Sequence, residues 1–286
     1  MFMSRFVAPV LLALLVAVPA QAQTVLHTEP SAFSPVLVYE SEGERCMAFG
    51  DMFAPGRQTC YRLDAPQRMV FNYTRMMMSA LLVQPEPRRI LIIGLGGGTL
   101  PSALTTLLPQ ARIDVVEIDP AVVTVATRYF GFNPSTRLRV HQADGRAFVE
   151  QAVRERRGYD LIMLDAFDYN YIPRHLMTQE FLTQVRGLLN GGGVLAANTF
   201  ASSALYDRES ATYGAVFGPY FNLRANNRVI IAVKGALPDD ATLAERAAQW
   251  APRLAGFGID TSAELKRVTR DVRWPQQTAV LTDASD

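Results

Sequence analysis

Several residues in this 286-residue chain have types and spacing that could bind a nucleoside. Residues 94–98 form a glycine turn in which Gly94, Gly96 and Gly98 let the backbone turn tightly and approach a ligand. The dinucleotide pattern G-x-G-x-x-G is broken at its last glycine, because Thr99 stands there. Taken alone, the turn is therefore only a weak indication of a nucleotide site.

Acidic residues follow the next three apolar segments. Glu117 could accept both hydrogen bonds of a ribose diol, and Asp144, followed by Gly145, could accept one from an adenine amino group. Asp165 and Asp168 follow the last of these segments. Each has a local alternative, a solvated strand end for Glu117 and a turn or helix N-cap for Asp144 and Asp165. Because three successive segments end in this way beside a glycine turn, we predict a nucleoside site.

The segments that carry these residues alternate between strand-like and helix-like patterns, which predicts a doubly wound, mostly parallel α/β sheet. In such sheets ligands lie beyond the carboxyl ends of the strands, so the fold would bring the motifs together. We expect strands at 89–94, 113–118, 138–142, 161–164 and 194–198 and a hairpin at 222–224 and 229–233. We expect helices at 100–108, 120–129, 146–156, 178–189 (ended by Asn190 and the glycines at 191–193) and 241–254.

The residues before this alternation have a different pattern. Short segments separated by Gly, Pro and Asp predict a small antiparallel sheet, followed by a Met-rich helix at 74–82 that ends before Pro85. The expected strands are 36–41, 46–51, 58–63 and 69–73. We therefore divide the chain into an N-terminal β domain with its linking helix (23–84) and a Rossmann-like catalytic domain (85–286).

Residues 1–22 have the three-part pattern of a secretory signal peptide. A short positive start leads into the apolar run Phe6–Ala20, and Ala20–Ala22 is a small-x-small cleavage site. An uncleaved anchor is the alternative, but the run is shorter than the roughly 20 residues that span a bilayer. We expect a soluble protein that is exported to the periplasm or secreted, with no membrane span after cleavage.

The composition favours a globular protein with a sizeable core, at 49% hydrophobic and 19% charged residues. A net charge of +1 gives no basic footprint for nucleic acid. In an oxidising compartment Cys46 and Cys60, which flank a turn signal at 53–56, could form a disulfide, or they could be two small buried hydrophobes. The cysteines and the three scattered histidines show no metal-ligand spacing, so we expect no metal site.

In chain order, Tyr73, the glycine turn, Glu117, Asp144 and residues 159–168 resemble the spermidine synthase (polyamine aminopropyltransferase) family. The small β domain before the core fits too, and the resemblance covers about residues 35–235. It implies a class I methyltransferase-type fold, no permanently bound cofactor, and decarboxylated S-adenosylmethionine or S-adenosylmethionine as co-substrate. It also implies a small-molecule amine as acceptor, and many relatives of this kind form homodimers.

The same resemblance implies a role for each residue. Glu117 would hold the donor's ribose and Asp144 its adenine. Asp165 would accept the amine proton and orient the attacking nitrogen, while Asp168 and Tyr73 would anchor or align the acceptor amine. By contrast, we interpret His175 and Arg146 as a surface histidine and a helix-face arginine.

Three departures from the family pattern point to a divergent, spermidine synthase-like branch. Gly97 stands where relatives carry an Asp that meets the donor's amine and repels an intact methionine carboxylate. Arg75 is an unfavourable neighbour for a polycation, and residues 169–173 differ from the usual Pro-x-Gly-Pro. Two alternatives to aminopropyl transfer therefore stay open: methyl transfer from S-adenosylmethionine, and a non-catalytic exported protein that binds a nucleoside or polyamine.

Overall fold

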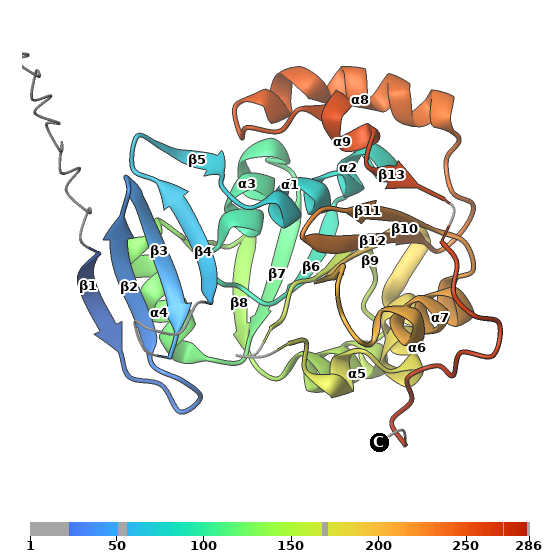
Figure 1. The fold of residues 1–286 in the computed structure, drawn as a ribbon, viewed down its shortest axis with the longest axis horizontal. Coiled ribbons are helices and arrows are strands. Elements are labelled where there is room, and N and C mark those ends of the chain that lie inside the picture. The colour runs from blue at the N-terminus through green and yellow to red at the C-terminus, as the bar shows by residue number, and fades with distance from the viewer. Residues whose placement is uncertain (1–22, 51–55, 168–170, 271, 285–286) are drawn as a thin grey trace, which may run out of the picture.

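The structure is a computed structural model that describes residues 23–50, 56–167, 171–270 and 272–284. Within these ranges a five-stranded sheet stands beside an eight-stranded sheet that is covered by helices (Figure 1). The signal-peptide prediction, Asp168 and most of the expected turn at 53–56 lie outside the described residues. No helix in the described part of the chain is long and apolar enough to cross a bilayer.

The N-terminal sheet is antiparallel, in the order β1-β2-β3-β4-β5. Its strands are β1 (Thr24–Glu29), β2 (Val36–Ser41), β3 (Glu44–Phe49), β4 (Arg57–Arg62) and β5 (Ala65–Met69). Because strand side chains alternate between faces, Val36 and Val38 join the main core whereas Leu37 packs against the cysteine face. Cys46 and Cys60 are paired across β3 and β4 and form a disulfide, which confirms the bridge.

The central sheet is mixed, in the order β13-β11-β12-β10-β9-β6-β7-β8. β8, β7, β6, β9 and β10 are parallel, and β12, β11 and β13 extend them antiparallel. The strands are β6 (Arg89–Ile93), β7 (Arg112–Glu117), β8 (Leu138–Gln142), β9 (Tyr159–Leu164), β10 (Leu189–Phe200), β11 (Tyr220–Arg224), β12 (Asn227–Val233) and β13 (Val268–Thr269). The predicted Rossmann-like fold is thus confirmed.

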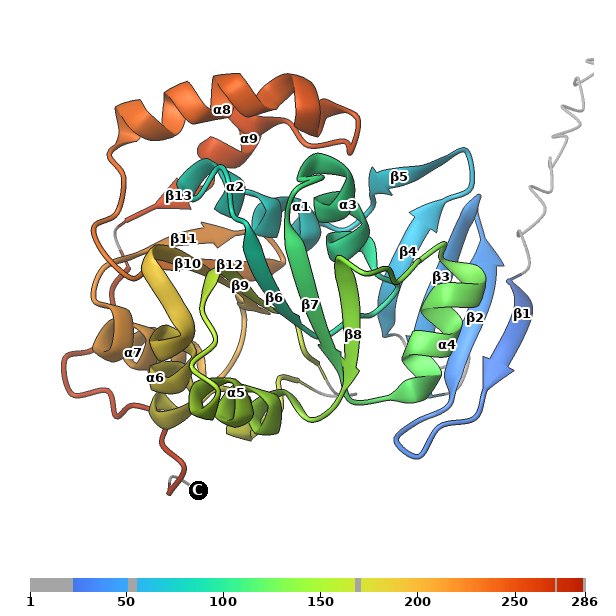
Figure 2. The ribbon, with the colours of Figure 1, turned by 180° about the vertical axis from the view of Figure 1, so that it is seen from behind.

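Helices cover both faces of this sheet (Figures 1 and 2). They are α1 (Asn72–Met78), α2 (Ala80–Val83), α3 (Thr99–Leu107), α4 (Pro120–Tyr129), α5 (Gly145–Arg154), the 3-10 turn η1 (Arg174–Leu176), α6 (Gln179–Leu188), α7 (Tyr206–Phe217), α8 (Asp240–Ala255) and α9 (Thr261–Leu265). In β6, Ile90 and Ile92 face the core under α1, α2, α3 and α8, whereas Leu91 and Ile93 face α5, α6 and α7. Burial on both faces explains the continuous apolar run.

The helix α1 joins the two sheets. Met76, Met77 and Met78 are completely buried, in the same hydrophobic cluster as Val38 of the N-terminal sheet and Ile90 of the central sheet. The helix α4 packs between β7 and β2, and Figure 2 shows it beside the N-terminal sheet. The N-terminal sheet is therefore fastened to the edge of the central sheet where β7 and β8 lie.

The structure corrects the predicted elements in three places. The strand expected at 69–73 is wrong, because β5 ends at Met69 and α1 begins at Asn72. The glycines after Asn190 do not simply end a helix, because α6 stops at Leu188 and Gly191–Gly193 lie within β10, where the register with β9 shifts between Leu189 and Val194. The helix α7 was not expected, because its buried residues include Glu209. A polar buried face gives no apolar periodicity to read.

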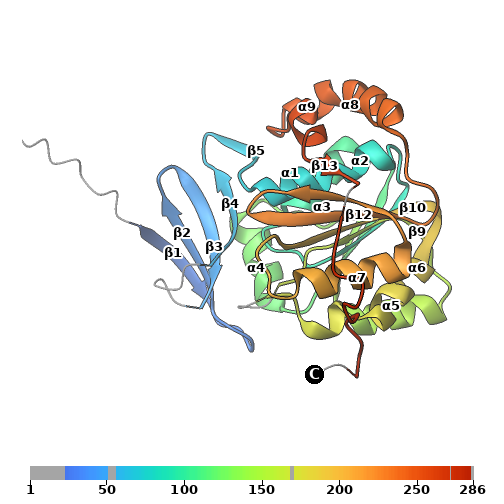
Figure 3. The same ribbon diagram turned by 45° about the vertical axis from the view of Figure 1, so that its right-hand side comes forward.

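The C-terminal segment after α9 has little regular structure, but hydrogen bonds attach it to the rest of the protein. The Leu281 carbonyl accepts a hydrogen bond from the Gln179 amide at 2.7 Å, and the Leu281 amide donates to Thr212 Oγ1 at 2.9 Å. Figure 3 shows this segment crossing α7 on its way to the end of the chain. It thus ends beside α6, on the α5–α6–α7 side of the sheet.

Candidate active site

A cavity of about 550 Å³ lies where β6, β7 and β9 end, and the N-terminal sheet forms part of its wall. Its volume is within the range of small-molecule sites. Most of the predicted site residues line it: Tyr73, Gly94, Gly96, Glu117, Asp144, Gly145 and Asp165. The strand ends thus bring together residues that are up to 92 positions apart (165 − 73) in the sequence.

The glycine turn has a backbone that requires glycine at two positions. Gly94 has φ +98°, and a Cβ there would lie 2.2 Å from the carbonyl oxygen of Asp165. Gly98 has φ +78° and caps α3, and a Cβ there would meet the ring of Phe132 at 2.6 Å. These glycines let the end of β9 and the start of α3 close tightly around the turn.

Glu117, at the end of β7, is 9% exposed. Its Oε2 accepts from the Leu95 amide at 2.9 Å, and its Oε1 accepts from the Asp119 amide at 3.0 Å. Burial raises the pKa of Glu117, and the backbone donors partly offset this. Each oxygen keeps a lone pair, so the fixed carboxylate can also accept hydrogen bonds from a diol in the cavity.

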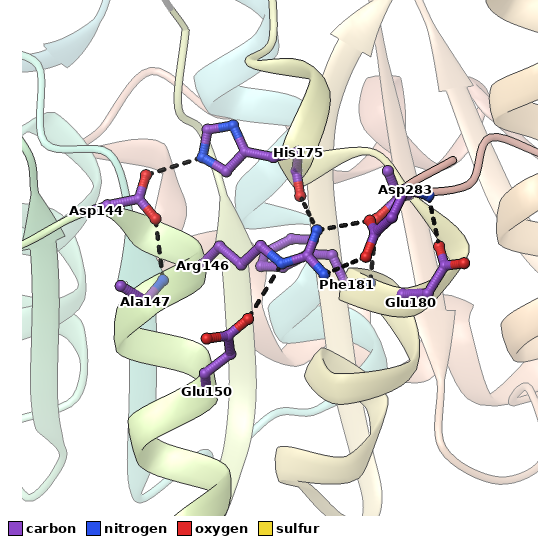
Figure 4. A network of polar contacts seen from close by, with 9 residues as sticks. Asp144, Arg146, Ala147, Glu150, His175, Glu180, Phe181 and Asp283 are labelled. Carbon is purple, nitrogen blue, oxygen red and sulfur yellow. Dashed lines mark hydrogen bonds and ion pairs between the residues drawn. The ribbon is translucent and has the colours of Figure 1, made fainter. Parts of the chain in front are cut away.

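Asp144 is the N-cap of α5, since its Oδ1 accepts from the Ala147 amide at 3.0 Å. Its Oδ2 lies 2.8 Å from Nε2 of His175, which also lines the cavity (Figure 4). Burial acts to raise the pKa of Asp144, but the donors from Ala147 and His175 outweigh it and the pKa is lowered. His175 is exposed at the surface, as expected, and it also forms part of the cavity wall.

Asp165 lies just after β9 and is partly exposed to the cavity. Its Oδ1 accepts from Asn198 Nδ2 at 2.9 Å, and it also accepts from the hydroxyl of Tyr73. Burial raises the pKa of Asp165 to about 7, although both donors lower it. Asn198 is held by Asn227, whose Nδ2 donates to its Oδ1 at 3.1 Å. A carboxyl group with this pKa can accept or release a proton near neutral pH.

Arg75 does not face the cavity, although its position after Tyr73 suggested a neighbour of the acceptor amine. Its guanidinium donates to the carbonyls of Met69 and Val70 and to the side chain of Asn72. Arg75 is not one of the residues that line the cavity. The reason is that α1 turns this side chain toward the end of β5.

Gly97 is enclosed by the N-terminal sheet. A Cβ at this position would lie 2.5 Å from Thr59 Cγ2 and 3.1 Å from the Phe130 ring. Thr59 is 5% exposed, and its Oγ1 lies 3.4 Å from Thr99 Oγ1. Neutral hydroxyl groups therefore stand at the place where the sequence lacks the family's acidic side chain.

Sequence reasoning did not single out several further residues of the site, four of which are described here. Ile118 and Phe33 line the cavity with 45% and 60% of their surface exposed, as apolar groups that a ligand would cover. Thr59 and Asn198 come from strands whose sequences carry no catalytic signal. Of these four, only Ile118, directly after Glu117, could have been found from the sequence.

The described residues offer one grouping with the types of a metal site, Glu44 with Cys46 and Cys60. The two thiols are joined in the disulfide, so their sulfurs are not available as thiolate ligands.

Comparison with known proteins gives consistent similarities. Residues 70–221 match the family described as "Spermine/spermidine synthase domain". The chain is 43% identical to the polyamine aminopropyltransferase of Vibrio vulnificus, over 91% of this chain and 89% of that protein. A probable spermidine synthase from Corynebacterium glutamicum has the same fold, with a TM-score of 0.70 at 19% identity, covering 91% of this chain and 97% of that one. Human Methyltransferase-like protein 13, solved in complex with SAH, superimposes with a TM-score of 0.53 at 27% identity, covering 72% and 92%.

Proposed function

Because the chain belongs to the spermine/spermidine synthase family, we propose that it transfers an aminopropyl group from decarboxylated S-adenosylmethionine to an amine. One observation carries the proposal: Asp165, with its pKa raised to about 7, lies in the cavity that Glu117 and Asp144 also line. A proton acceptor and the two groups suited to a nucleoside thus share one small-molecule site.

The proposed reaction needs no oxidant and no metal. The neutral nitrogen of the acceptor amine attacks the propyl carbon next to the sulfonium, so a C–N bond forms as the C–S bond breaks. Sulfur keeps the electron pair and leaves as the thioether of 5′-methylthioadenosine. The ammonium proton passes to Asp165, whose carboxylate also holds the nitrogen in line with the carbon.

Tyr73 and Asp168 complete the proposal at the acceptor end. Burial raises the pKa of Tyr73 well above its ordinary value, so its hydroxyl stays protonated and donates to Asp165. Asp168 lies outside the described residues, and its role in anchoring the acceptor amine rests on the sequence motif.

The test is an assay of purified protein with decarboxylated S-adenosylmethionine and a panel of diamines and polyamines, in which mass spectrometry detects the polyamine product and 5′-methylthioadenosine. Asp165→Asn should reduce the rate by about 10²- to 10⁴-fold, the usual contribution of a general base. Asp160→Asn is the matched control, since Asp160 is held by backbone donors at the other end of the same strand. Failure to form product with any amine would refute aminopropyl transfer.

Methyl transfer from intact S-adenosylmethionine is the second candidate, favoured by the uncharged surroundings of Gly97. The same assay with the intact donor distinguishes the two, because methyl transfer yields S-adenosylhomocysteine instead of 5′-methylthioadenosine. Nucleoside binding without turnover of either donor would support the third alternative, a binding protein.

We also propose that the protein is exported. The signal pattern lies in residues 1–22, outside the described ranges, and the Cys46–Cys60 disulfide supports an oxidising compartment. Cell fractionation followed by N-terminal sequencing should find a mature chain that starts at Gln23. Recovery of the full-length chain from the cytosol would contradict export.

A further inference from the structure

We propose that the C-terminal segment Thr278–Asp283 positions the nucleobase end of the cavity from outside the cavity wall. Asp283 fixes Arg146, and Arg146 holds the turn that carries His175. His175 in turn orients Asp144, so that the segment sets the preference of the site for an adenine base. The inference rests on the proposed function only in taking the cavity as a nucleoside site.

The first step is the orientation of Asp144. Its two oxygens accept from the Ala147 amide at 3.0 Å and from His175 at 2.8 Å, so the plane of the carboxylate is fixed from both sides (Figure 4). Each carboxylate oxygen can accept more than one hydrogen bond. An exocyclic amino group can therefore join His175 on Oδ2, and it meets an acceptor that needs no reorganisation.

The second step is the support of His175 itself. The residue lies in the short turn η1, and 46% of its side-chain surface is exposed, so packing alone does not fix the ring. Its carbonyl oxygen accepts from Arg146 Nη1 at 3.4 Å. Arg146 thus ties the turn to α5, the helix that Asp144 caps.

The third step is the ion pair between Arg146 and Asp283. Arg146 Nη1 and Nη2 donate to the two oxygens of Asp283 at 2.6 and 2.5 Å (Figure 4). This bidentate ion pair fixes the orientation of both side chains. The Arg146 side chain is 19% exposed, and its hydrogen bonds lower the pKa of Asp283 to about 2.

The last step is the anchorage of the segment. Leu281 is 2% exposed and is hydrogen-bonded to Gln179 and Thr212, and the Asp283 amide donates to Glu180 Oε2 at 3.0 Å. Asp283 is therefore held in place by contacts with α6 and α7 that do not involve the cavity. Because Asp283 is fixed in this way, its ion pair can position Arg146.

The test is a ratio of affinities, measured by titration calorimetry on the full chain. The probes are 5′-methylthioadenosine and 5′-methylthioinosine. Only the adenine base carries the exocyclic amino group from which Asp144 would accept a hydrogen bond. The native protein should prefer the adenine nucleoside. His175→Ala and Asp283→Asn should each lower this preference by about three- to tenfold, the usual effect of one hydrogen bond.

Two further variants sharpen the test. Arg146→Lys keeps the positive charge but loses the bidentate contact with Asp283, so it should give an intermediate ratio of the two affinities. Asp240→Asn is the matched control, because Asp240 pairs with Arg270 at 2.8 Å on the surface and is 91% exposed. This control should leave both affinities unchanged.

An unchanged ratio in His175→Ala and Asp283→Asn would overturn the inference, and so would equal weakening of both nucleosides, which a general structural role predicts. If Asp283→Asn fails to fold, as judged by thermal unfolding, Arg146→Lys and His175→Ala decide. A native protein that binds neither nucleoside overturns the inference together with the nucleoside site. A native protein that binds the adenine nucleoside but transfers no aminopropyl group contradicts only the proposed reaction, and the ratio still tests the role of the C-terminal segment.

Discussion

The contact between Asn198 and Asp165 gives a quantitative prediction for the pH dependence of the reaction. Asn198 is 3% exposed and donates to Asp165 Oδ1 at 2.9 Å. This hydrogen bond stabilises the carboxylate, so it lowers the pKa of Asp165, which burial has raised to about 7. Asn198→Ala removes the donor and should raise the pKa further.

The size of the shift follows from the energy of the bond. A hydrogen bond to a charged group contributes about 1.5–3 kcal/mol, and one pKa unit corresponds to about 1.4 kcal/mol. Water entering the space left by the side chain restores part of this, so we expect a rise in the pKa of Asp165 of about one unit. At pH 7 the ionised fraction of Asp165 would then fall from about one half to about one tenth, an approximately fivefold loss of rate.

The assay is the pH profile of kcat/KM for the acceptor amine at saturating donor. Asp165 must be ionised to accept the proton, so the rising limb should move from about pH 7 to about pH 8 and the rates should converge near pH 9. The titration of the amine itself is the same for both proteins and cancels in the comparison. Asn190→Ala is the control, since Asn190 donates to Asp160 at 2.7 Å outside the cavity. A uniform loss of rate at all pH values, or an equal shift in the control, would refute the reasoning.

Three further predictions concern stability. Because the pKa of Asp165 is raised in the folded state, the protonated side chain stabilises the fold fully below about pH 4, and this stabilisation is lost as the pH rises through about 7. Asp165→Asn should therefore be more stable than the native protein at pH 8, by at most about 4 kcal/mol. Equal urea midpoints of the two proteins at pH 8 would contradict this. Replacing both Cys46 and Cys60 by Ala should lower the free energy of unfolding by about 3 kcal/mol, because the bridge spans 14 residues, and an unchanged denaturation midpoint would count against it. Gly97→Asp should cost about 1–3 kcal/mol by its clash with Thr59, and the double variant with Thr59→Ala should recover part of that loss; simple additivity of the two changes would exclude the clash.

Elements whose signal is local were predictable to the residue. The strands β2 and β8 and the helix α4 begin and end where expected, because apolar periodicity, Asp119 as N-cap and Pro120 at the first helical position act within a few residues. Elements whose signal depends on distant partners were not. The polar groups on the buried face of α7 form hydrogen bonds with other elements; for example, Arg228 Nη2 on β12 donates to Ser210 Oγ at 2.9 Å. The sequence of α7 contains no pattern that predicts this partner.

The candidate site divides in the same way. Gly94, Glu117, Asp144 and Asp165 could be predicted because each lies at or just after the carboxyl end of a strand, and the strands of a parallel sheet bring these ends to one edge. His175 and Asn198 could not, because their importance lies in a single contact with a residue more than 30 positions away.

The amino-acid sequence by itself predicted that Glu117, Asp144 and Asp165 meet beside the glycine turn, since strand patterning and strand-end chemistry are local properties. The tertiary structure alone decided how those carboxylates behave. Burial raises the pKa of Asp165 to about 7 even though Asn198 donates to its carboxylate. The fold also packs Thr59 against Gly97, turns Arg75 away from the cavity and brings Asp283 to Arg146. Burial and hydrogen bonds between distant residues set the charge and orientation of each group, and they exist only once the chain has folded.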